Sequence, residues 1–256
     1  MNIYPAIDLY QGAAVRLFKG DYSQMTIYDE SPLTVAEAYK IQGSSSLHLV
    51  DLEGARDGKT TNLSAIKNIV EHVDLFVQLG GGIRDMKTAE TYLDMGVDRL
   101  ILGTAAITDP AFLKEAVRSY GSQIAVGIDI KEEKVAIKGW TELSTYTCDQ
   151  FCQQMQELGV QTIICTDVSR DGAMKGTNRQ LYRRLSQAYS LDIIASGGVS
   201  TLLDISALSA MGLHGAILGK ALYTGAFTLE EALETAVATS ASQNPLPEAE
   251  RKEARR

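Results

Sequence analysis

Cysteine, histidine and tryptophan are scarce in this sequence, and their scarcity excludes several kinds of site. The 256 residues include three cysteines, three histidines and one tryptophan. Three cysteines are too few for a disulfide framework, and isolated thiols that pack as small apolar side chains are typical of a reducing cytosol. We therefore expect Cys148, Cys152 and Cys165 to be buried. The histidines are scattered along the chain and suggest neither a catalytic triad nor a metal cluster, so we expect no bound metal.

The sequence also lacks long apolar runs and an excess of basic charge. No apolar run is long enough to span a bilayer, and the first residues enter a strand pattern directly, so we expect neither a membrane span nor a signal peptide. The net charge is −8 and no basic face is evident, which argues against a nucleic-acid or membrane partner. We expect a cytoplasmic protein, and nothing in the sequence demands more than a monomer.

A glycine-rich pattern that occurs twice is the most informative feature of the sequence. Residues 79–105 align without a gap with residues 195–221, at a constant offset of 116 residues that pairs Gly81 with Gly197 and Gly103 with Gly219. Repeats of this length indicate that one structural unit is used twice. We therefore expect an internal duplication of two half-barrels, each with four βα units.

Short apolar segments recur between helical patterns along the whole chain. The expected strands are residues 3–8, 47–51, 75–79, 99–103, 124–129, 162–167, 192–195 and 216–218. Eight such units in a chain of this size predict a single (β/α)8 TIM barrel of the α/β class over residues 1–239, followed by a disordered tail at 240–256. Two long polar loops are expected at 10–31 and 131–146, with residues 135–138 extended inside the second.

Each copy of the glycine pattern predicts a concave site for a phosphate group. Backbone amides at strand ends beside a helix start favour an anion, and glycine lets the backbone approach it closely. We call the first site the first glycine cup, formed by Gly81, Gly82, Gly103 and Thr104. The second glycine cup is formed by Gly197, Gly198, Gly219 and Lys220. Two cups on opposite sides of one barrel mouth point to a small molecule with a phosphate at each end.

Two aspartates that end the first and fifth expected strands are candidates for acid–base chemistry. Asp8 and Asp129 would face each other across the barrel mouth, between the two cups. Their mutual repulsion would separate their pKa values, so that one carboxyl acts as a base and the other as an acid. Each could instead cap a loop, and the same two readings stay open for Asp51 and Asp167. Trp140, on a long polar loop, could stack on a flat ring of the ligand.

Several motifs in combination resemble those of a known enzyme family. They are Pro5-Ala-Ile-Asp-Leu, Val15-Arg-Leu, Gly20-Asp-Tyr, His48-Leu-Val-Asp-Leu, Gly80-Gly-Gly-Ile-Arg, Gly139-Trp and Thr166-Asp-Val-Ser-Arg-Asp-Gly. The sequence is similar in these places to the phosphoribosylformimino-aminoimidazole carboxamide ribotide isomerases of histidine biosynthesis. The resemblance covers the chain from Met1 to about Thr239.

The resemblance implies a (β/α)8 barrel that converts a bisphosphorylated aminoaldose to an aminoketose, an Amadori rearrangement without a cofactor. It implies that Asp8 is the base, that Asp129 is the acid and that Thr166 assists. It also implies that Arg16 and Trp140 hold the substrate. The loops after the first and sixth strands complete the candidate substrate-binding set with Gly20, Asp171, Gly172 and Gly176.

Three alternatives stay open at this stage. A cyclase-type sister barrel shares the repeat and both aspartates, but its first strand normally reads Cys-Leu-Asp where this sequence has Ala6-Ile7-Asp8. A bifunctional relative also isomerises phosphoribosylanthranilate and carries an arginine where this sequence has Lys138. The third alternative is a barrel that binds a phosphosugar without turning it over.

Overall fold

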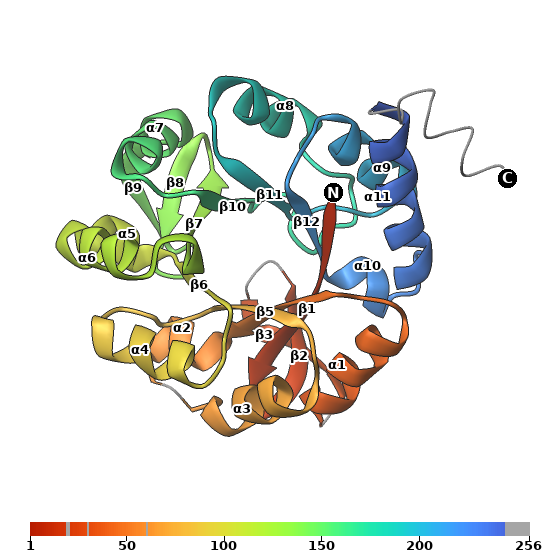
Figure 1. Cartoon of the computed structure of the whole chain (residues 1–256), viewed down its shortest axis with the longest axis horizontal. Coiled ribbons are helices and arrows are strands. Elements are labelled where there is room, and N and C mark those ends of the chain that lie inside the picture. Colours follow the sequence, from red (N-terminus) through yellow and green to blue (C-terminus); the bar gives the residue numbers. More distant parts are fainter. Residues whose placement is uncertain (19–20, 30, 60, 244–256) are drawn as a thin grey trace, which may run out of the picture.

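Eight parallel strands form a closed barrel in the computed structural model, which describes residues 1–18, 21–29, 31–59 and 61–243. The strands follow one another around the barrel in chain order, and it closes where β12 pairs with β1. They are β1 (Asn2–Tyr10), β4 (Ser46–Asp51), β5 (Phe76–Gly80), β6 (Arg99–Leu102), β7 (Ile124–Lys131), β10 (Thr162–Asp167), β11 (Asp192–Ser196) and β12 (Gly215–Leu218). Helices surround the strands (Figure 1). The TIM barrel predicted from the sequence is therefore confirmed.

The helices begin and end largely where the sequence signals place them. Ser31 accepts a hydrogen bond from the Thr34 amide at the start of α1, and Asp85 caps α4 in the same way. The helices are α1 (Pro32–Ile41), α2 (Leu52–Asp57), α3 (Leu63–His72), α4 (Met86–Asp94), α5 (Thr104–Thr108), α6 (Pro110–Tyr120), α7 (Cys148–Leu158), α8 (Arg179–Ala188), α9 (Leu202–Ala210), α10 (Lys220–Tyr223) and α11 (Leu229–Gln243), with a 3-10 turn at Gly121–Gln123.

The last helix is longer than expected. α11 continues past Thr239 to Gln243, so the expected disordered tail cannot begin at residue 240. Residues 240–243 read Ser-Ala-Ser-Gln, which contains no helix breaker, and the first proline after them is Pro245. The remainder of the expected tail, residues 244–256, lies outside the described residues.

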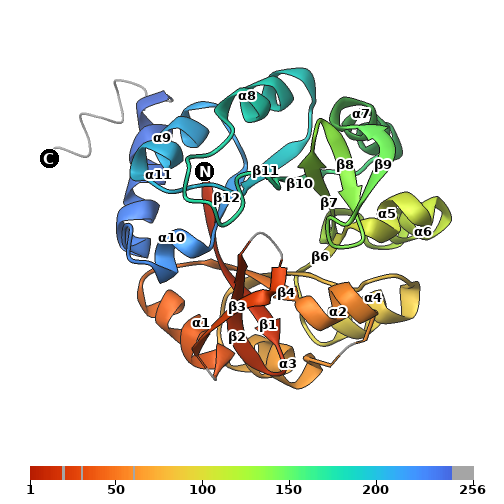
Figure 2. The same cartoon turned by 180° about the vertical axis from the view of Figure 1, so that it is seen from behind.

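Two β-hairpins replace the two long loops, and this part of the prediction was wrong. β2 (Ala13–Phe18) pairs antiparallel with β1, and β3 (Asp21–Asp29) pairs with β2. β8 (Lys134–Ile137) pairs antiparallel with β7, and β9 (Glu142–Thr147) pairs with β8. Figure 2 shows both hairpins from the reverse side. β3 and β9 are mostly exposed, so their sequences lack the apolar alternation that marks a half-buried strand. The extended segment expected at 135–138 is confirmed by β8 as far as Ile137.

The side chains of the barrel strands point alternately inward and outward. Inside the barrel, one apolar cluster fills the lower part of the lumen; it consists of Tyr4, Ala6, Ile101, Ala125, Ile164, Ile194 and Ile217. A much larger cluster lies between the strands and the helices and includes Ile7, Leu9, Leu49 and Leu79. Because side chains alternate with a period of two, the row that begins with Tyr4 and Ala6 places Asp8 inside the barrel as well.

Candidate active site

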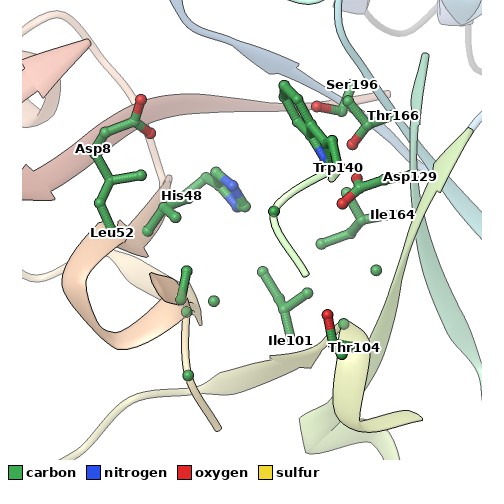
Figure 3. A pocket seen from close by; sticks show the side chains of 18 of the residues that line it. Asp8, His48, Leu52, Ile101, Thr104, Asp129, Trp140, Ile164, Thr166 and Ser196 are labelled. Carbon is green, nitrogen blue, oxygen red and sulfur yellow. The ribbon is translucent and has the colours of Figure 1, made fainter. Parts of the chain in front are cut away.

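The inward rows of side chains become polar at the C-terminal ends of the strands. Asp129 follows Ala125 and Gly127 on β7, and Thr166 follows Ile164 on β10. These polar ends line a cavity of about 290 Å³. Figure 3 shows Asp8 and His48 on one side of this cavity, and Asp129, Thr166 and Trp140 on the other. The structure thus brings the two predicted catalytic aspartates to one cavity, as the strand pattern indicated.

Asp8 is buried and forms an ion pair with Arg16 on the neighbouring strand β2. Arg16 Nη1 lies 2.9 Å from Asp8 Oδ2, and Arg16 Nη2 lies 3.4 Å from Asp171 Oδ1. Burial raises the pKa of Asp8, against the opposing effect of the Arg16 charge, and the nearby Asp171 raises it further. The two carboxylates outweigh the effect of burial on Arg16 and raise its pKa, so the guanidinium stays charged. Arg16 therefore joins two carboxylates in this structure.

Asp129 is half-buried and is held by the two side chains next to it. Its carboxyl group accepts hydrogen bonds from Trp140 and Thr166. Burial raises the pKa of Asp129 and outweighs these hydrogen bonds, which act in the opposite direction. Trp140 has a positive φ of 69° in the turn between β8 and β9, and this conformation directs its side chain to the cavity. The side chain expected to stack on a ligand thus also positions a candidate acid.

His48 lines the same cavity, and our reading of the sequence missed it. It lies on β4 between Leu47 and Leu49, and its Nδ1 is 3.1 Å from Nε2 of the buried Gln78 on β5. Burial lowers the pKa of His48 to about 3, with a smaller contribution from the charge of Arg16. The sequence contained a signal for this residue, because a single polar side chain at an inward position of an apolar barrel strand costs free energy unless it forms a hydrogen bond.

The first glycine cup has the tight backbone that the pattern predicted. Gly81 and Gly82 follow β5 with φ angles of +112° and +77°. A Cβ on Gly82 would lie 2.3 Å from the carbonyl oxygen of Gly54, and one on Gly81 would lie 2.2 Å from that of Asp51. Gly81, Gly82, Gly103 and Thr104 all line the main cavity. Only glycine fits the first two positions, so the backbone turn after β5 is a requirement of the fold.

The second glycine cup lies beside the main cavity and is nearly filled. Gly197, Gly198, Gly219 and Lys220 line a hollow of only about 20 Å³. Gly219 has φ and ψ of −112° and −101°, close to the −98° and −107° of Gly103 in the first cup. The guanidinium carbon of Arg16 lies 2.6 Å from the position that a Cβ on Gly219 would take. Arg16 thus occupies the space beside Gly219.

The remaining predicted site residues that the structure describes lie around the second hollow rather than in the main cavity alone. Asp171 and Gly172 line the second hollow, and the Gly172 carbonyl accepts a hydrogen bond from Lys220 Nζ at 2.9 Å. Gly176 packs against Gly198, where a Cβ on Gly198 would lie 2.6 Å from the Gly176 carbonyl oxygen, and its expected contact with substrate stays a prediction. Gly20 lies outside the described residues.

Asp51 and Asp167 cap loops, which supports one of the two readings left open for them. Asp51 Oδ1 accepts hydrogen bonds from the Gly54 amide at 2.9 Å and from Asn62 Nδ2 at 2.7 Å. Asp167 accepts from the Ser169 amide at 3.0 Å and from Asn178 Nδ2 at 2.7 Å. Both side chains hold the segments against which the glycine turns pack.

Other expectations concern the whole chain. The three cysteines are free thiols and buried, as predicted. Within residues 1–18, 21–29, 31–59 and 61–243, no three histidine, cysteine or acidic side chains are grouped as a metal would need. In the same part of the chain, every helix is too short or too polar to cross a membrane.

Known proteins resemble the chain along most of its length. Residues 2–228 match the model of the family described as histidine biosynthesis protein. Three similar relatives share the name 1-(5-phosphoribosyl)-5-((5-phosphoribosylamino)methylideneamino) imidazole-4-carboxamide isomerase. The relative from Ruminiclostridium cellulolyticum is 48% identical over 233 residues, which cover 91% of this chain and 99% of the relative. Those from Listeria welshimeri and Synechocystis sp. are 47% and 48% identical, over 91% of this chain and 98% and 92% of their own lengths. The chain therefore belongs to the family of histidine biosynthesis proteins.

Proposed function

We propose that this protein is an isomerase of histidine biosynthesis that converts a bisphosphorylated aminoaldose, the phosphoribosylformimino-aminoimidazole carboxamide ribotide, to the corresponding aminoketose. The observation that carries the proposal is the cavity in which Asp8 and Asp129 lie between two glycine cups. A substrate anchored at both phosphates has its sugar held between the two carboxyls, which supplies orientation without a cofactor. The relatives at 47–48% identity bear the name of this isomerase.

The reaction divides into two proton transfers at opposite sides of the sugar. Asp129 donates a proton to the ring oxygen, the carbon–oxygen bond of the ring breaks, and the nitrogen lone pair forms the imine. Asp8 then takes the proton from the adjacent carbon, and the resulting enol rearranges to the ketone. Burial raises the pKa of Asp129, which favours the protonated form that an acid needs. Burial raises the pKa of Asp8 as well, and the ion pair with Arg16 acts against burial, in favour of the ionised form.

Thr166 and Trp140 hold the acid, and the cups hold the phosphates. The hydrogen bonds from Thr166 and Trp140 fix the position of the Asp129 carboxyl beside the cavity. Lys220 supplies a cation to the second cup, as a point charge without the bidentate geometry of arginine. The steps move protons and electron pairs within the substrate and leave no net oxidation or reduction, so the proposed reaction requires no redox cofactor.

Matching contacts in the two halves support our inference that the barrel arose by duplication. The hydrogen bond from Asn62 Nδ2 to Asp51 measures 2.7 Å, and the one from Asn178 Nδ2 to Asp167 also measures 2.7 Å. Both pairs are related by the offset of 116 residues that relates the glycine cups (51 to 167, 62 to 178). A duplicated half-barrel accounts for two anion sites on one mouth.

The test is turnover of the purified aminoaldose by the wild type and by Asp8→Asn and Asp129→Asn, followed by chromatography of substrate and product. Loss of a general acid or base typically lowers the rate about 10²–10⁴-fold, and we expect that loss in both variants. Asp171→Asn is measured in parallel, because Asp171 raises the pKa of both carboxyls. Full activity of Asp129→Asn together with loss in Asp171→Asn would move the acid role to Asp171.

The alternative functions predict different outcomes of the same assay. A binding protein would retain the ligand and release no product. A cyclase would require ammonia or a glutaminase partner, and none of the three relatives compared bears such a name. Dual activity requires turnover of phosphoribosylanthranilate. Against it, Lys138 Nζ is exposed and pairs with Glu142 Oε1 at 2.9 Å, where a bifunctional relative has arginine.

The same proposal includes a monomer in the cytoplasm. The chain carries both cups and both carboxyls, so the site is complete without a second copy. Three buried free thiols suit a reducing compartment. Light scattering during gel filtration tests the monomer, with a mass near 27.7 kDa expected.

A further inference from the structure

Arg16 makes two contacts in this structure that the bound substrate would compete for. Its Nη1 pairs with Asp8, the proposed base, at 2.9 Å, and its guanidinium fills the space beside Gly219 in the second glycine cup. That cup is reduced to about 20 Å³, against about 290 Å³ for the main cavity. One side chain therefore covers an oxygen of the base and part of the site that a phosphate would enter.

In the empty enzyme, Arg16 also does not use all of its hydrogen-bond donors. Its Nε is buried and has no hydrogen-bond partner among the residues that the structure describes. A buried donor without a partner is costly, and burial makes it more so. The contact to Asp171 is long at 3.4 Å. The guanidinium therefore has donor capacity that its two carboxylate neighbours do not use.

We propose that Arg16 blocks the catalytic base until substrate binds. In the empty enzyme Arg16 pairs with Asp8, and it turns to the phosphate when that group enters the second glycine cup. This inference rests on the proposed function, since it takes Asp8 as the base. A phosphate brings nearly two negative charges and three acceptor oxygens, and arginine binds such a group through two parallel hydrogen bonds. The exchange frees Asp8 Oδ2 only when the substrate is in place.

The consequence for catalysis follows from the charge around Asp8. While Arg16 is paired, its positive charge favours the carboxylate and weakens it as a base. Once Arg16 turns to the phosphate, the pKa of Asp8 rises, and a base with a higher pKa accepts a proton more readily. In the empty enzyme the charge of Asp8 is compensated by Arg16. A second role of the phosphate is therefore to activate Asp8, the residue that reacts with the sugar.

The other titratable groups near Asp8 do not replace Arg16. Asp171 is a like charge and acts in the opposite direction. Tyr22, Tyr39 and Tyr223 face Asp8 from β3, α1 and α10, and burial is the main cause that raises the pKa of each hydroxyl above 10, so they are neutral in the acidic range. His48, with its pKa lowered to about 3, is neutral above that pH. Among the residues that the structure describes, Arg16 is thus the cation that lowers the pKa of Asp8.

The glycines of the two cups provide a matched pair of variants. In Gly219→Ala the new methyl group would lie 2.6 Å from the guanidinium of Arg16 and displace it. The backbone at φ −112° and ψ −101° lies outside the regions that alanine favours, and the control variant shares this cost. In Gly103→Ala, at nearly the same φ and ψ, nothing lies within 4 Å of the new methyl group. The first substitution should free Asp8 and the second should not.

The experiment follows the carboxyl carbon of Asp8 by NMR in the full-length protein labelled with ¹³C at aspartate. Asp8→Asn identifies the resonance. The titration midpoint of Asp8 is measured without anion in the wild type, Gly219→Ala, Gly103→Ala and Arg16→Met. It is measured again with inorganic sulfate, a stand-in for phosphate that keeps its charge over the acidic range, against chloride at equal ionic strength.

We expect the midpoint to move to higher pH in Gly219→Ala and Arg16→Met, and to stay at the wild-type value in Gly103→Ala. Sulfate should raise the midpoint more in the wild type than in Arg16→Met, where only direct repulsion by the anion acts. A wild-type midpoint in folded Gly219→Ala, or an equal effect of sulfate with and without Arg16, would overturn the proposal. If Gly219→Ala does not fold, the sulfate comparison decides. Turnover of the aminoaldose by the wild type reports separately on the proposed function.

Discussion

His48 is kept neutral inside the barrel by its surroundings. The imidazole is buried on β4, where Nδ1 lies against the amide nitrogen of Gln78, so the ring proton is on Nε2 in this arrangement. Burial first, and then the charge of Arg16, lower its pKa from 6.5 to about 3. A neutral imidazole at this place can donate a hydrogen bond to a ligand in the cavity without adding charge beside Asp8.

The low pKa of His48 predicts how stability depends on pH. Between pH 6.5 and 3 the unfolded chain binds a proton at His48 that the folded protein does not, so this group destabilises the fold as pH falls through that window. From pH 6.5 to 4.5 we expect the wild type to lose at most about 3 kcal/mol of unfolding free energy that His48→Gln does not lose. Urea unfolding of both proteins at several pH values measures the difference.

The exposed His72 provides the control for that prediction, because its ring lies on the surface of α3, where Nδ1 is 2.8 Å from the carbonyl oxygen of Asn68. His72→Gln should follow the pH dependence of the wild type. Parallel curves for the wild type and His48→Gln would show that His48 titrates normally in the folded protein.

At the scale of single elements, the turns that follow β5 and β11 are the most constrained parts of the site. Each turn has two consecutive glycines with positive φ, at residues 81–82 and 197–198. Each packs on the loop that an aspartate caps, so carbonyl oxygens stand where a Cβ would be. The close approach that prepares an anion site is therefore built from backbone packing between neighbouring βα loops.

Gly82→Ala tests this packing against Gly225→Ala, which has a similar φ of +66° and nothing within 4 Å of a new Cβ. Left-handed backbone costs alanine about 1–2 kcal/mol at either position. The contact at 2.3 Å with the Gly54 carbonyl should add about 1–3 kcal/mol to the loss in Gly82→Ala. Denaturant unfolding gives both values, and equal losses would contradict a packing role for Gly82.

At the scale of the whole molecule, the barrel holds its ligand at two separate points. The first glycine cup opens into the main cavity, and the second lies in the hollow beside it, with Asp8, Asp129 and His48 between them. A rigid closed sheet fixes the spacing of the cups, since each lies at the ends of two adjacent strands. A ligand that spans both cups makes its second contact at a high effective concentration.

This geometry predicts much tighter binding of a bisphosphate than of a monophosphate. In a thermal-shift titration, the aminoketose product should produce a given rise in Tm at a concentration about 10²–10⁴-fold lower than ribose 5-phosphate. Gly198→Ala, in which a Cβ would lie 2.6 Å from the Gly176 carbonyl, should bring the bisphosphate close to the monophosphate. Equal rises in Tm at equal concentrations of the two ligands in the wild type would contradict binding at two points.

The sequence by itself determined the barrel, the glycine turns and the inward place of the two aspartates. These features follow from local patterns in the sequence, which can be recognised without knowing the tertiary structure. The patterns are the strand periodicity, the glycine repeat and the position of Asp8 and Asp129 at strand ends. The match between the expected strand 162–167 and β10 (Thr162–Asp167) shows how far this reaches. The roles of individual residues in the chemistry remain predictions.

Only the tertiary structure decided which side chains meet. Arg16 is separated from Asp171 by most of the chain, yet the two are 3.4 Å apart, and no local pattern predicts an ion pair across the barrel mouth. The hairpins were missed because their outer strands are exposed and lack alternation. His48 interrupts an apolar strand, which is a sequence signal, but its burial and low pKa come from its surroundings in the folded barrel. Pairing, burial and charge balance depend on closure of the sheet, which brings distant residues into one cavity.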